Sequence, residues 1–247
     1  MSFAGKTYWL IGASEGLGRA LALEMGKDGA ALIVSARNEE RLKALLRELP
    51  TGSRALPLDV ADKDAVEAAI EGLGDVDGII YAAGTYWPLS SQTWEPENVE
   101  TMIQTNFLGA ARCLGPIVKK FASKNAGHIV IIGSLSGFRG LPKAIGYGAS
   151  KAALMHLAEN IHADLYRTNV KVQLINPGFI KTRLTDKNEF AMPFIISAGQ
   201  AATKVKNAMA TNRFQTNFPR LFSSVFLFFR ILPSFLYFKI VGSKDRR

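Results

Sequence analysis

The chain has 247 residues, of which 48% are hydrophobic and 21% are charged, so it holds enough apolar material for a sizeable folded core. A single cysteine, Cys113, excludes an intrachain disulfide and fits a reducing compartment, and the histidines at 128, 156 and 162 lack zinc-ligand spacing, so we expect no metal site. The net charge is +9, and six Lys or Arg with only one acid follow Phe218 beside many phenylalanines, which favours a membrane surface over nucleic acid.

The first residues, MSFAGKTYWLIGAS, do not show the basic segment and long apolar run of a secretory signal. We therefore expect a cytoplasmic protein, with the basic tail allowing a position peripheral to the inner face of a membrane.

Apolar, β-prone runs alternate along the chain with longer segments of 3.6-residue periodicity. The expected strands are residues 7–12, 30–35, 55–58, 78–82, 127–133 and 170–176, with 213–218 as a last strand. Near-continuous apolar runs are typical of parallel strands that are buried on both faces. The pattern predicts an α/β fold with three αβα layers around a doubly wound parallel sheet, which binds ligands beyond the carboxyl ends of its strands.

The composition changes at Pro219. Neither an internal repeat nor a Pro/Gly/Ser-rich linker precedes this residue, so we expect a single domain over residues 1–218. Residues 219–247 form a hydrophobic, basic tail, in which Arg230, Pro233 and Lys239 interrupt the apolar run before it could span a bilayer. The composition fits an interfacial membrane segment almost equally as well as an arm packed on the enzyme body or on a partner subunit.

A glycine-rich loop follows the first expected strand and opens the first expected helix. It consists of Gly12, Ala13, Ser14, Glu15, Gly16, Leu17 and Gly18. Glycines in this context let backbone N–H groups approach a pyrophosphate at a helix N-terminus. The loop therefore predicts a dinucleotide site, with a glycine-rich turn that binds no ligand as the alternative.

The end of the second expected strand bears on the choice of cofactor. An NAD site would place an acid there for the ribose hydroxyls, whereas this chain has Ser35-Ala36-Arg37-Asn38. Arg37 can pair with a 2′-phosphate, unless it is a solvated residue at the start of the next helix. Glu15 would repel that phosphate, but on balance NADP(H) is favoured over NAD(H).

Tyr147 and Lys151 are spaced by four residues at the start of an expected helix and share one helical face. A free tyrosine has a pKa near 10, so acid/base work at neutral pH requires stabilisation of the phenolate. A lysine ammonium one turn away and the positive end of the helix would both provide it. We predict Tyr147 as general acid/base and Lys151 as its activating cation.

These motifs resemble the classical short-chain dehydrogenase/reductase family, over about residues 5–218. The resemblance implies a Rossmann-fold, NAD(P)-dependent oxidoreductase that acts on carbonyl and alcohol groups. It implies that Ser134 polarises the substrate carbonyl, with Ser136 as the less favoured candidate, and that Asn106 holds a water relay behind Lys151. Further cofactor contacts are implied at Asp59, Val60, Ala82, Ala83, Gly84, Tyr147, Lys151, Pro177, Gly178, Ile180 and Thr182. Tyr81-Ala82 departs from the family's Asn-Asn pair.

The resemblance also implies a substrate lid at about residues 183–198, where Phe190, Met192, Phe194 and Ile195 would form an apolar cover. This favours a lipophilic carbonyl or alcohol substrate. The expected helices after Val99 and Tyr147 resemble those through which the family forms homodimers and homotetramers. Two alternatives remain open: a protein of the same fold that senses NADP(H) without turnover, and a membrane-surface scaffold.

Overall fold

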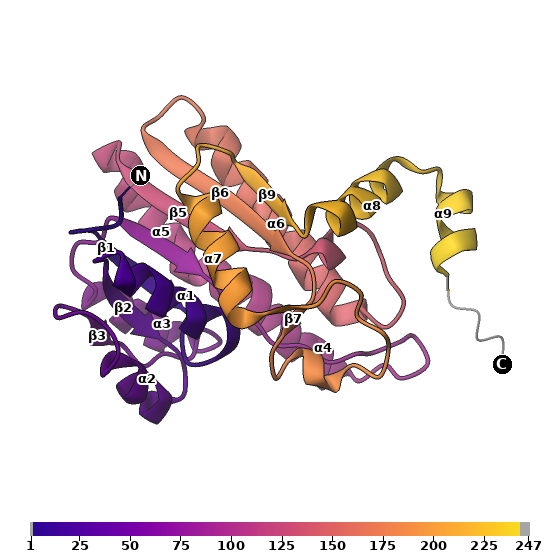
Figure 1. The fold of residues 1–247 in the computed structure, drawn as a ribbon, viewed down its shortest axis with the longest axis horizontal. Coiled ribbons are helices and arrows are strands. Elements are labelled where there is room, and N and C mark those ends of the chain that lie inside the picture. The colour runs from indigo at the N-terminus through magenta and orange to yellow at the C-terminus, as the bar shows by residue number, and fades with distance from the viewer. Residues whose placement is uncertain (1, 243–247) are drawn as a thin grey trace.

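The computed structural model describes residues 2–242, and within these residues a seven-stranded parallel sheet forms the centre of the molecule (Figure 1). Its strand order is β3-β2-β1-β4-β5-β6-β9. The strands are β1 Thr7–Ile11, β2 Ala31–Ser35, β3 Arg54–Ala55, β4 Gly78–Tyr81, β5 Gly127–Ile132, β6 Val170–Pro177 and β9 Gln215–Phe218. The chain order reverses between β1 and β4, so the doubly wound parallel sheet expected from the sequence is confirmed.

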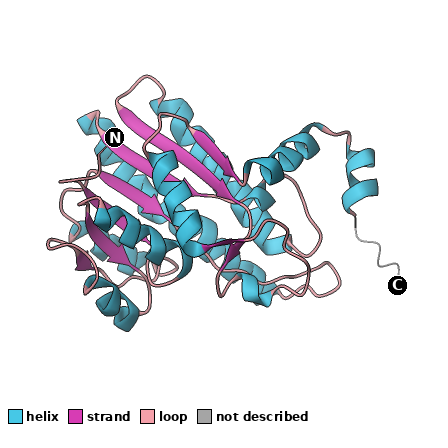
Figure 2. Cartoon of the chain, viewed as in Figure 1, coloured by secondary structure: helices cyan, strands magenta, loops and turns pink. Residues whose placement is uncertain are grey.

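Helices flank both faces of this sheet (Figure 2). They are α1 Gly16–Lys27, α2 Glu39–Leu46, α3 Lys63–Glu71, α4 Pro96–Ile103, α5 Gly109–Lys124, α6 Ile145–Leu165 and α7 Ala198–Met209. A π-helical segment, Gln104–Leu108, joins α4 to α5, and short 3₁₀ turns occupy Leu135–Gly137 and Thr185–Lys187. A small parallel pair, β7 Ile180–Lys181 and β8 Ile196–Ser197, lies outside the main sheet.

Alternate residues of each strand enter different cores. In β1, Trp9 packs in the core formed with α3, α5 and α6, whereas Tyr8 and Leu10 pack in the core formed with α1, α2 and α7. Both faces of the strands are therefore covered, which explains why the strands read as continuous apolar runs in the sequence. Buried Cys113 lies in the first of these cores.

A buried network of polar side chains runs across one face of the sheet through His128 of β5. Its Nδ1 lies 2.9 Å from the Tyr8 hydroxyl, and its Nε2 lies 2.8 Å from Oε1 of Gln173 on β6. The Gln173 amide nitrogen in turn donates to the backbone carbonyls of Ala208, Thr211 and Arg213. Each side-chain polar atom of Tyr8, His128 and Gln173 in this network has a hydrogen-bond partner, as burial requires.

The segment after Phe218 is helical. It forms α8 Arg220–Ile231 and α9 Ser234–Val241, which lie at one end of the molecule, outside the helices that cover the sheet (Figure 1). Within residues 2–242, no helix is long and apolar enough to cross a membrane. The expected tail extends over 219–247, and its residues 243–247 lie outside the described part of the chain.

The third strand is shorter than expected. Only Arg54–Ala55 pairs as β3, although the backbone N–H groups of Leu56 and Leu58 still donate to the carbonyls of Val34 and Ala36. The chain thus leaves the sheet gradually before Asp59.

Candidate active site

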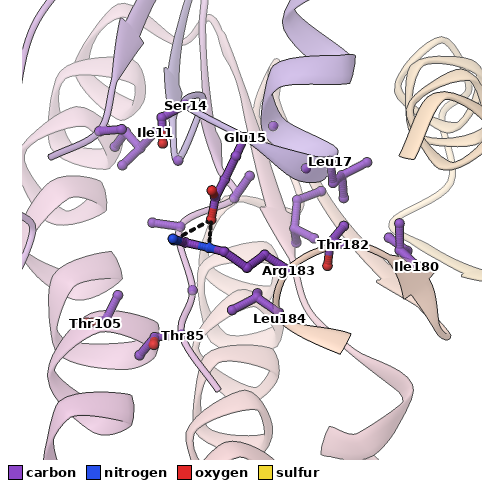
Figure 3. Close-up of a pocket in the computed structure, with 18 of the residues that line it drawn as sticks. Ile11, Ser14, Glu15, Leu17, Thr85, Thr105, Ile180, Thr182, Arg183 and Leu184 are labelled. Carbon is purple, nitrogen blue, oxygen red and sulfur yellow. Dashed lines mark hydrogen bonds and ion pairs between the residues drawn. The ribbon is translucent and has the colours of Figure 1, made fainter. Parts of the chain in front are cut away.

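A cavity of about 750 Å³ opens at the carboxyl ends of β1 and β4, where the strand order reverses (Figure 3). It is lined by every cofactor residue expected from the sequence and by three of the four expected catalytic residues, Ser134, Tyr147 and Lys151. The expected cofactor residues in its wall are Gly12, Ser14, Glu15, Gly16, Leu17, Gly18, Arg37, Asp59, Val60, Ala82, Ala83, Gly84, Tyr147, Lys151, Pro177, Gly178, Ile180 and Thr182. Segments far apart in the sequence therefore meet at the position that the topology predicts.

The glycine loop forms one end of the cavity. Gly12 has φ +94°, and a Cβ there would lie 2.5 Å from the Ala83 backbone nitrogen. A Cβ on Gly18 would lie 2.0 Å from the Gly12 carbonyl oxygen, so neither position accepts a side chain. α1 begins at Gly16, and its N-cap residue Glu15 makes no side-chain cap hydrogen bond in the described structure. The first turn of α1 is thus available to an anionic group, which fits a dinucleotide pyrophosphate.

Glu15 is instead held by two arginines. Its carboxylate accepts hydrogen bonds from Nη1 of Arg41 and from Nε and Nη2 of Arg183, the last two at 3.1 and 2.8 Å. Figure 3 shows Arg183 reaching across the cavity to Glu15. The ion pairs compensate the charge of Glu15 and connect the glycine loop to the chain that follows Thr182.

The end of β2 also contributes cations to the cavity. Arg37 and Arg41 both line it. Asn38 caps α2 by accepting a hydrogen bond from the Arg41 backbone N–H at 2.9 Å, which fixes the turn that carries Arg37.

Ser134, Tyr147 and Lys151 all line the cavity. Ser134 follows β5, whereas Tyr147 and Lys151 lie one turn apart in the first turns of α6. The hydroxyls of Ser134 and Ser136 are 2.9 Å apart, and Ser134 also hydrogen-bonds Tyr147. Of the two serines, Ser134 is the one in the cavity wall, whereas Ser136 lies at a second cavity.

Lys151 is buried, and its ammonium donates to the Ile132 carbonyl at 3.0 Å. The ammonium lies 5.8 Å from the centroid of the Tyr147 ring. Burial lowers the pKa of Lys151 to about 8.

The pKa of Tyr147 differs from the expected direction. Burial raises it above the ordinary value, and the hydrogen bond with Ser134 offsets only part of this rise. The ammonium of Lys151 donates to a β5 carbonyl and not to the phenol oxygen, so no direct hydrogen bond from Lys151 holds the pKa of Tyr147 down. Tyr147 is therefore protonated at neutral pH, the state required to donate a proton to a carbonyl oxygen.

Asn106 lies behind the cavity wall, in the π-helical segment. Its side-chain amide exchanges two hydrogen bonds with the Thr85 backbone, at 2.7 and 3.0 Å, and donates to Ser150 Oγ at 3.0 Å. A Cβ added to Gly84 would be 3.4 Å from Asn106 Oδ1 and 3.7 Å from Lys151 Nζ. Asn106 thus ties the end of β4 to the helix that carries Tyr147, directly behind Lys151.

Tyr81, the last residue of β4, stands where the family that the sequence resembles has an asparagine. Its ring is fully buried, and its hydroxyl donates to the Thr105 carbonyl at 2.5 Å. This bond joins β4 to the π-helical segment that carries Asn106.

The lid region places polar groups on the cavity. Thr182, Arg183, Thr185 and Lys187 line it together with Leu184, whereas Phe190, Phe194 and Ile195 are exposed. Arg41, Arg183 and Lys187 were not singled out as site residues from the sequence. Only their proximity in the fold identifies them, since a charged residue in a loop or first helical turn is ordinarily a solvated one.

Comparisons with known proteins decide the family. A family model described as short chain dehydrogenase matches residues 6–192. The chain belongs to this family. It is an NAD(P)-dependent oxidoreductase of the short-chain dehydrogenase/reductase type.

Relatives of this short-chain dehydrogenase cover most of its length. A Myxococcus xanthus protein named uncharacterized oxidoreductase is 32% identical over 239 residues, or 94% of each chain. A Staphylococcus epidermidis protein of the same name is 31% identical over 204 residues, or 81% of this chain and 89% of the relative.

Solved structures show the same fold. A short chain dehydrogenase from Burkholderia cenocepacia in complex with NADP has a TM-score of 0.87 at 20% identity, covering 98% of this chain and 100% of that one. Actinorhodin polyketide ketoreductase with NADPH has a TM-score of 0.75 at 24% identity, covering 86% and 95%. The higher coverage of the first structure extends the likeness in fold into the C-terminal helices.

In residues 2–242, no group of three or more His, Cys, Asp or Glu side chains gathers where it would hold a metal ion.

Proposed function

We propose that the protein transfers hydride between NADP(H) and a lipophilic carbonyl compound or secondary alcohol. The observation that supports this proposal is that Ser134, Tyr147 and Lys151 line the same cavity as the glycine loop. A bound cofactor supplies or accepts the hydride. In reduction, the Tyr147 hydroxyl donates the proton, Ser134 hydrogen-bonds the carbonyl oxygen, and the Lys151 ammonium stabilises the resulting phenolate.

The test is oxidation of NADPH and NADH by ketones, aldehydes and acyl-chain carbonyls, followed on wild type and Tyr147→Phe. Removing the proton donor should lower kcat at least about 100-fold while NADPH still binds. Tyr166→Phe, which changes an exposed tyrosine of the same helix region, should leave kcat unchanged. Wild-type protein that oxidises neither cofactor with any substrate class would refute the proposed activity.

The preference for NADP(H) is supported by the charges around the end of β2. Arg37 and Arg41 line the cavity there, and the carboxylate of Glu15 is compensated by Arg41 and Arg183. The Glu15 carboxylate therefore repels a 2′-phosphate less than its position in the sequence suggests. Arg37 would pair with the phosphate through its guanidinium.

Glu15→Gln tests this arrangement. Loss of the carboxylate frees Arg41 for the phosphate, so the ratio of kcat/KM for NADPH to that for NADH should rise about fivefold, the effect of a partly exposed ion pair. Glu48→Gln is the matched control, because Glu48 pairs with Arg19 and does not line the cavity. An unchanged or lower ratio would contradict the assignment.

The lipophilic substrate class is supported by aromatic packing beside the cavity. Phe179 contacts Phe190 and Phe222, with ring centroids 6.0 and 5.8 Å apart, and Phe194 contacts Phe222 at 5.8 Å. These rings adjoin the cavity-lining residue Gly178, since a Cβ there would lie 3.2 Å from Phe222. Residues 183–198 would close over the substrate as a lid that contacts this cluster.

A homodimer or homotetramer formed through α5 and α6 is part of the proposal. Gly115, Ala149 and Ala152 are exposed small residues on these helices, and small residues permit close approach of helices from two subunits. Residues 1–218 would be the catalytic domain. The cytoplasmic location rests on the sequence, with the segment 219–247 as a peripheral attachment to the inner face of a membrane.

A further inference from the structure

α8 carries two apolar stripes instead of one. Phe222, Phe226 and Phe229 follow one another at four- and three-residue spacing, so they share a face, and all three are partly buried. Leu221, Val225 and Phe228 repeat the same spacing on another face, where they are 69%, 42% and 57% exposed. A helix that needed only to pack on the protein would have polar residues at these outer positions.

The inner stripe holds α8 on the body of the protein. Phe222 contacts Phe179, and Phe229 contacts Tyr237 of α9 with ring centroids 5.5 Å apart. α9 continues the exposed apolar surface, since Phe235, Phe238 and Ile240 are 72%, 58% and 57% exposed.

Arg139, in the loop between Ser134 and Tyr147, fixes the turn between the two helices. Its guanidinium donates to the carbonyls of Phe229 and Leu232, the latter at 2.6 Å, and lies 4.1 Å from the centre of the Tyr237 ring. The Tyr237 hydroxyl donates to the Gly140 carbonyl at 2.6 Å. These contacts anchor the exposed apolar surface of α8 and α9 to the body of the protein.

The charge around this surface has one sign. From residue 219 to residue 242 the sequence contains Arg220, Arg230 and Lys239 and no Asp or Glu, and all three cations are exposed. A symmetric contact between two copies of this patch would bring cations together without acids to pair them. An anionic lipid surface satisfies both features, because it accepts the apolar side chains and attracts the cations.

We propose that α8 and α9 dock in the interface of an anionic membrane, with Leu221, Val225, Phe228, Phe235, Phe238 and Ile240 in the acyl boundary and the three cations at the headgroups. The helices lie along the surface, since neither is long enough to span it.

The docked surface lies next to the substrate side of the cavity. Phe222 packs against Phe179 and against Phe194 of the lid region, and it also backs Gly178 in the cavity wall. For the proposed oxidoreductase, on which this step rests, a carbonyl compound dissolved in the bilayer would meet the lid without crossing water.

Flotation of the full chain with vesicles tests the docking without any turnover. Vesicles of phosphatidylcholine mixed with phosphatidylglycerol should bind the protein more tightly than vesicles of phosphatidylcholine alone. Leu221→Asp/Phe228→Asp should weaken binding at least about tenfold, because two exposed apolar side chains no longer enter the lipid. Arg230→Glu/Lys239→Glu should weaken binding to the anionic vesicles at least about fivefold and lose the preference for them.

The matched controls change exposed residues elsewhere. Trp94→Asp/Tyr166→Asp removes equally exposed apolar side chains, Arg47→Glu/Arg167→Glu reverses two exposed cations, and both should float like wild type. NADPH binding by every variant shows that it is folded. The proposal would be overturned if wild type failed to float, or if the control variants lost vesicle binding to the same extent. It would also be overturned if Leu221→Asp/Phe228→Asp dissociated a dimer while its vesicle binding persisted.

Discussion

Lys151 is a cation that loses its charge at a lower pH than an ordinary lysine. It is 4% exposed, its hydrogen bond goes to the Ile132 carbonyl, and burial lowers its pKa to about 8. In the proposed reduction, the phenolate left by proton transfer from Tyr147 is stabilised by the charge of the Lys151 ammonium, which lies 5.8 Å from the centre of the Tyr147 ring. The protonation state of Lys151 therefore sets the pH range of carbonyl reduction.

We expect kcat/KM for NADPH-dependent reduction to be constant below pH about 8 and to fall about tenfold per pH unit above it. The direction follows from the sign of the shift, because a lowered lysine pKa moves the loss of the charged form to lower pH. A pH profile measured on wild type and on Lys151→Ala gives the check. A profile that stays flat to about pH 10, where an ordinary lysine still holds its proton, would contradict this role.

At the same scale, the sequence indicated many of the residues that line the cavity, but it did not indicate Arg41, Arg183 and Lys187 or the electrostatics of the site. Tyr147 and Lys151 both line the cavity, yet the raised pKa of Tyr147 comes from its burial, which the four-residue spacing does not reveal. Glu15 is read from the sequence as a repelling charge because its partners Arg41 and Arg183 are 26 and 168 positions away.

At the scale of helices and strands, apolar runs predict elements that are buried on both faces. Residues 78–82 and 127–133 correspond closely to β4 and β5. The π-helical segment Gln104–Leu108 has no such signal, and its hydrogen bonds with Tyr81 and Ser150 are evident only in the fold. The sequence did not decide whether the segment after Phe218 contacts lipid or packs on protein. In the structure, one apolar stripe of α8 is partly buried and the other is exposed.

Arg139→Ala tests how these helices are held. The variant removes charge-assisted hydrogen bonds to the carbonyls of Phe229 and Leu232, which contribute about 1.5 to 3 kcal/mol to a local structure of this kind. Amide exchange in residues 229–241 should accelerate about tenfold or more, while the protection of β4 and β5 stays as in wild type. Arg167→Ala is the control, and equal acceleration in that variant or none in Arg139→Ala would contradict the anchoring role.

For the whole molecule, a buried polar chain from Tyr8 through His128 to Gln173 links β1, β5 and β6 on the face of the sheet that packs against α7. Burial lowers the pKa of His128 to about 4, because the protonated ring would lose its hydration. The unfolded chain takes up this proton near pH 6.5, whereas the folded chain does so only near pH 4. Stability is therefore present above about pH 6.5 and is lost as the pH falls towards about 4.

Denaturant unfolding at a series of pH values checks this. The free energy of unfolding should decrease by up to about 3 kcal/mol between pH 6.5 and pH 4 from His128 alone. His128→Gln should flatten this part of the curve although its stability at neutral pH is lower. His156→Gln, which changes an exposed histidine, should keep the wild-type slope, and an identical slope in all three proteins would exclude His128 as the source.

The contacts of Arg139 also order events during synthesis. They join residues 90 to 95 positions apart, and α8 and α9 are made after every strand of the sheet. A nascent chain therefore forms the loop that receives these helices before the helices leave the ribosome. The two helices therefore emerge when the body that holds their inner face has already been made, so little of this apolar segment is exposed to chance association during synthesis.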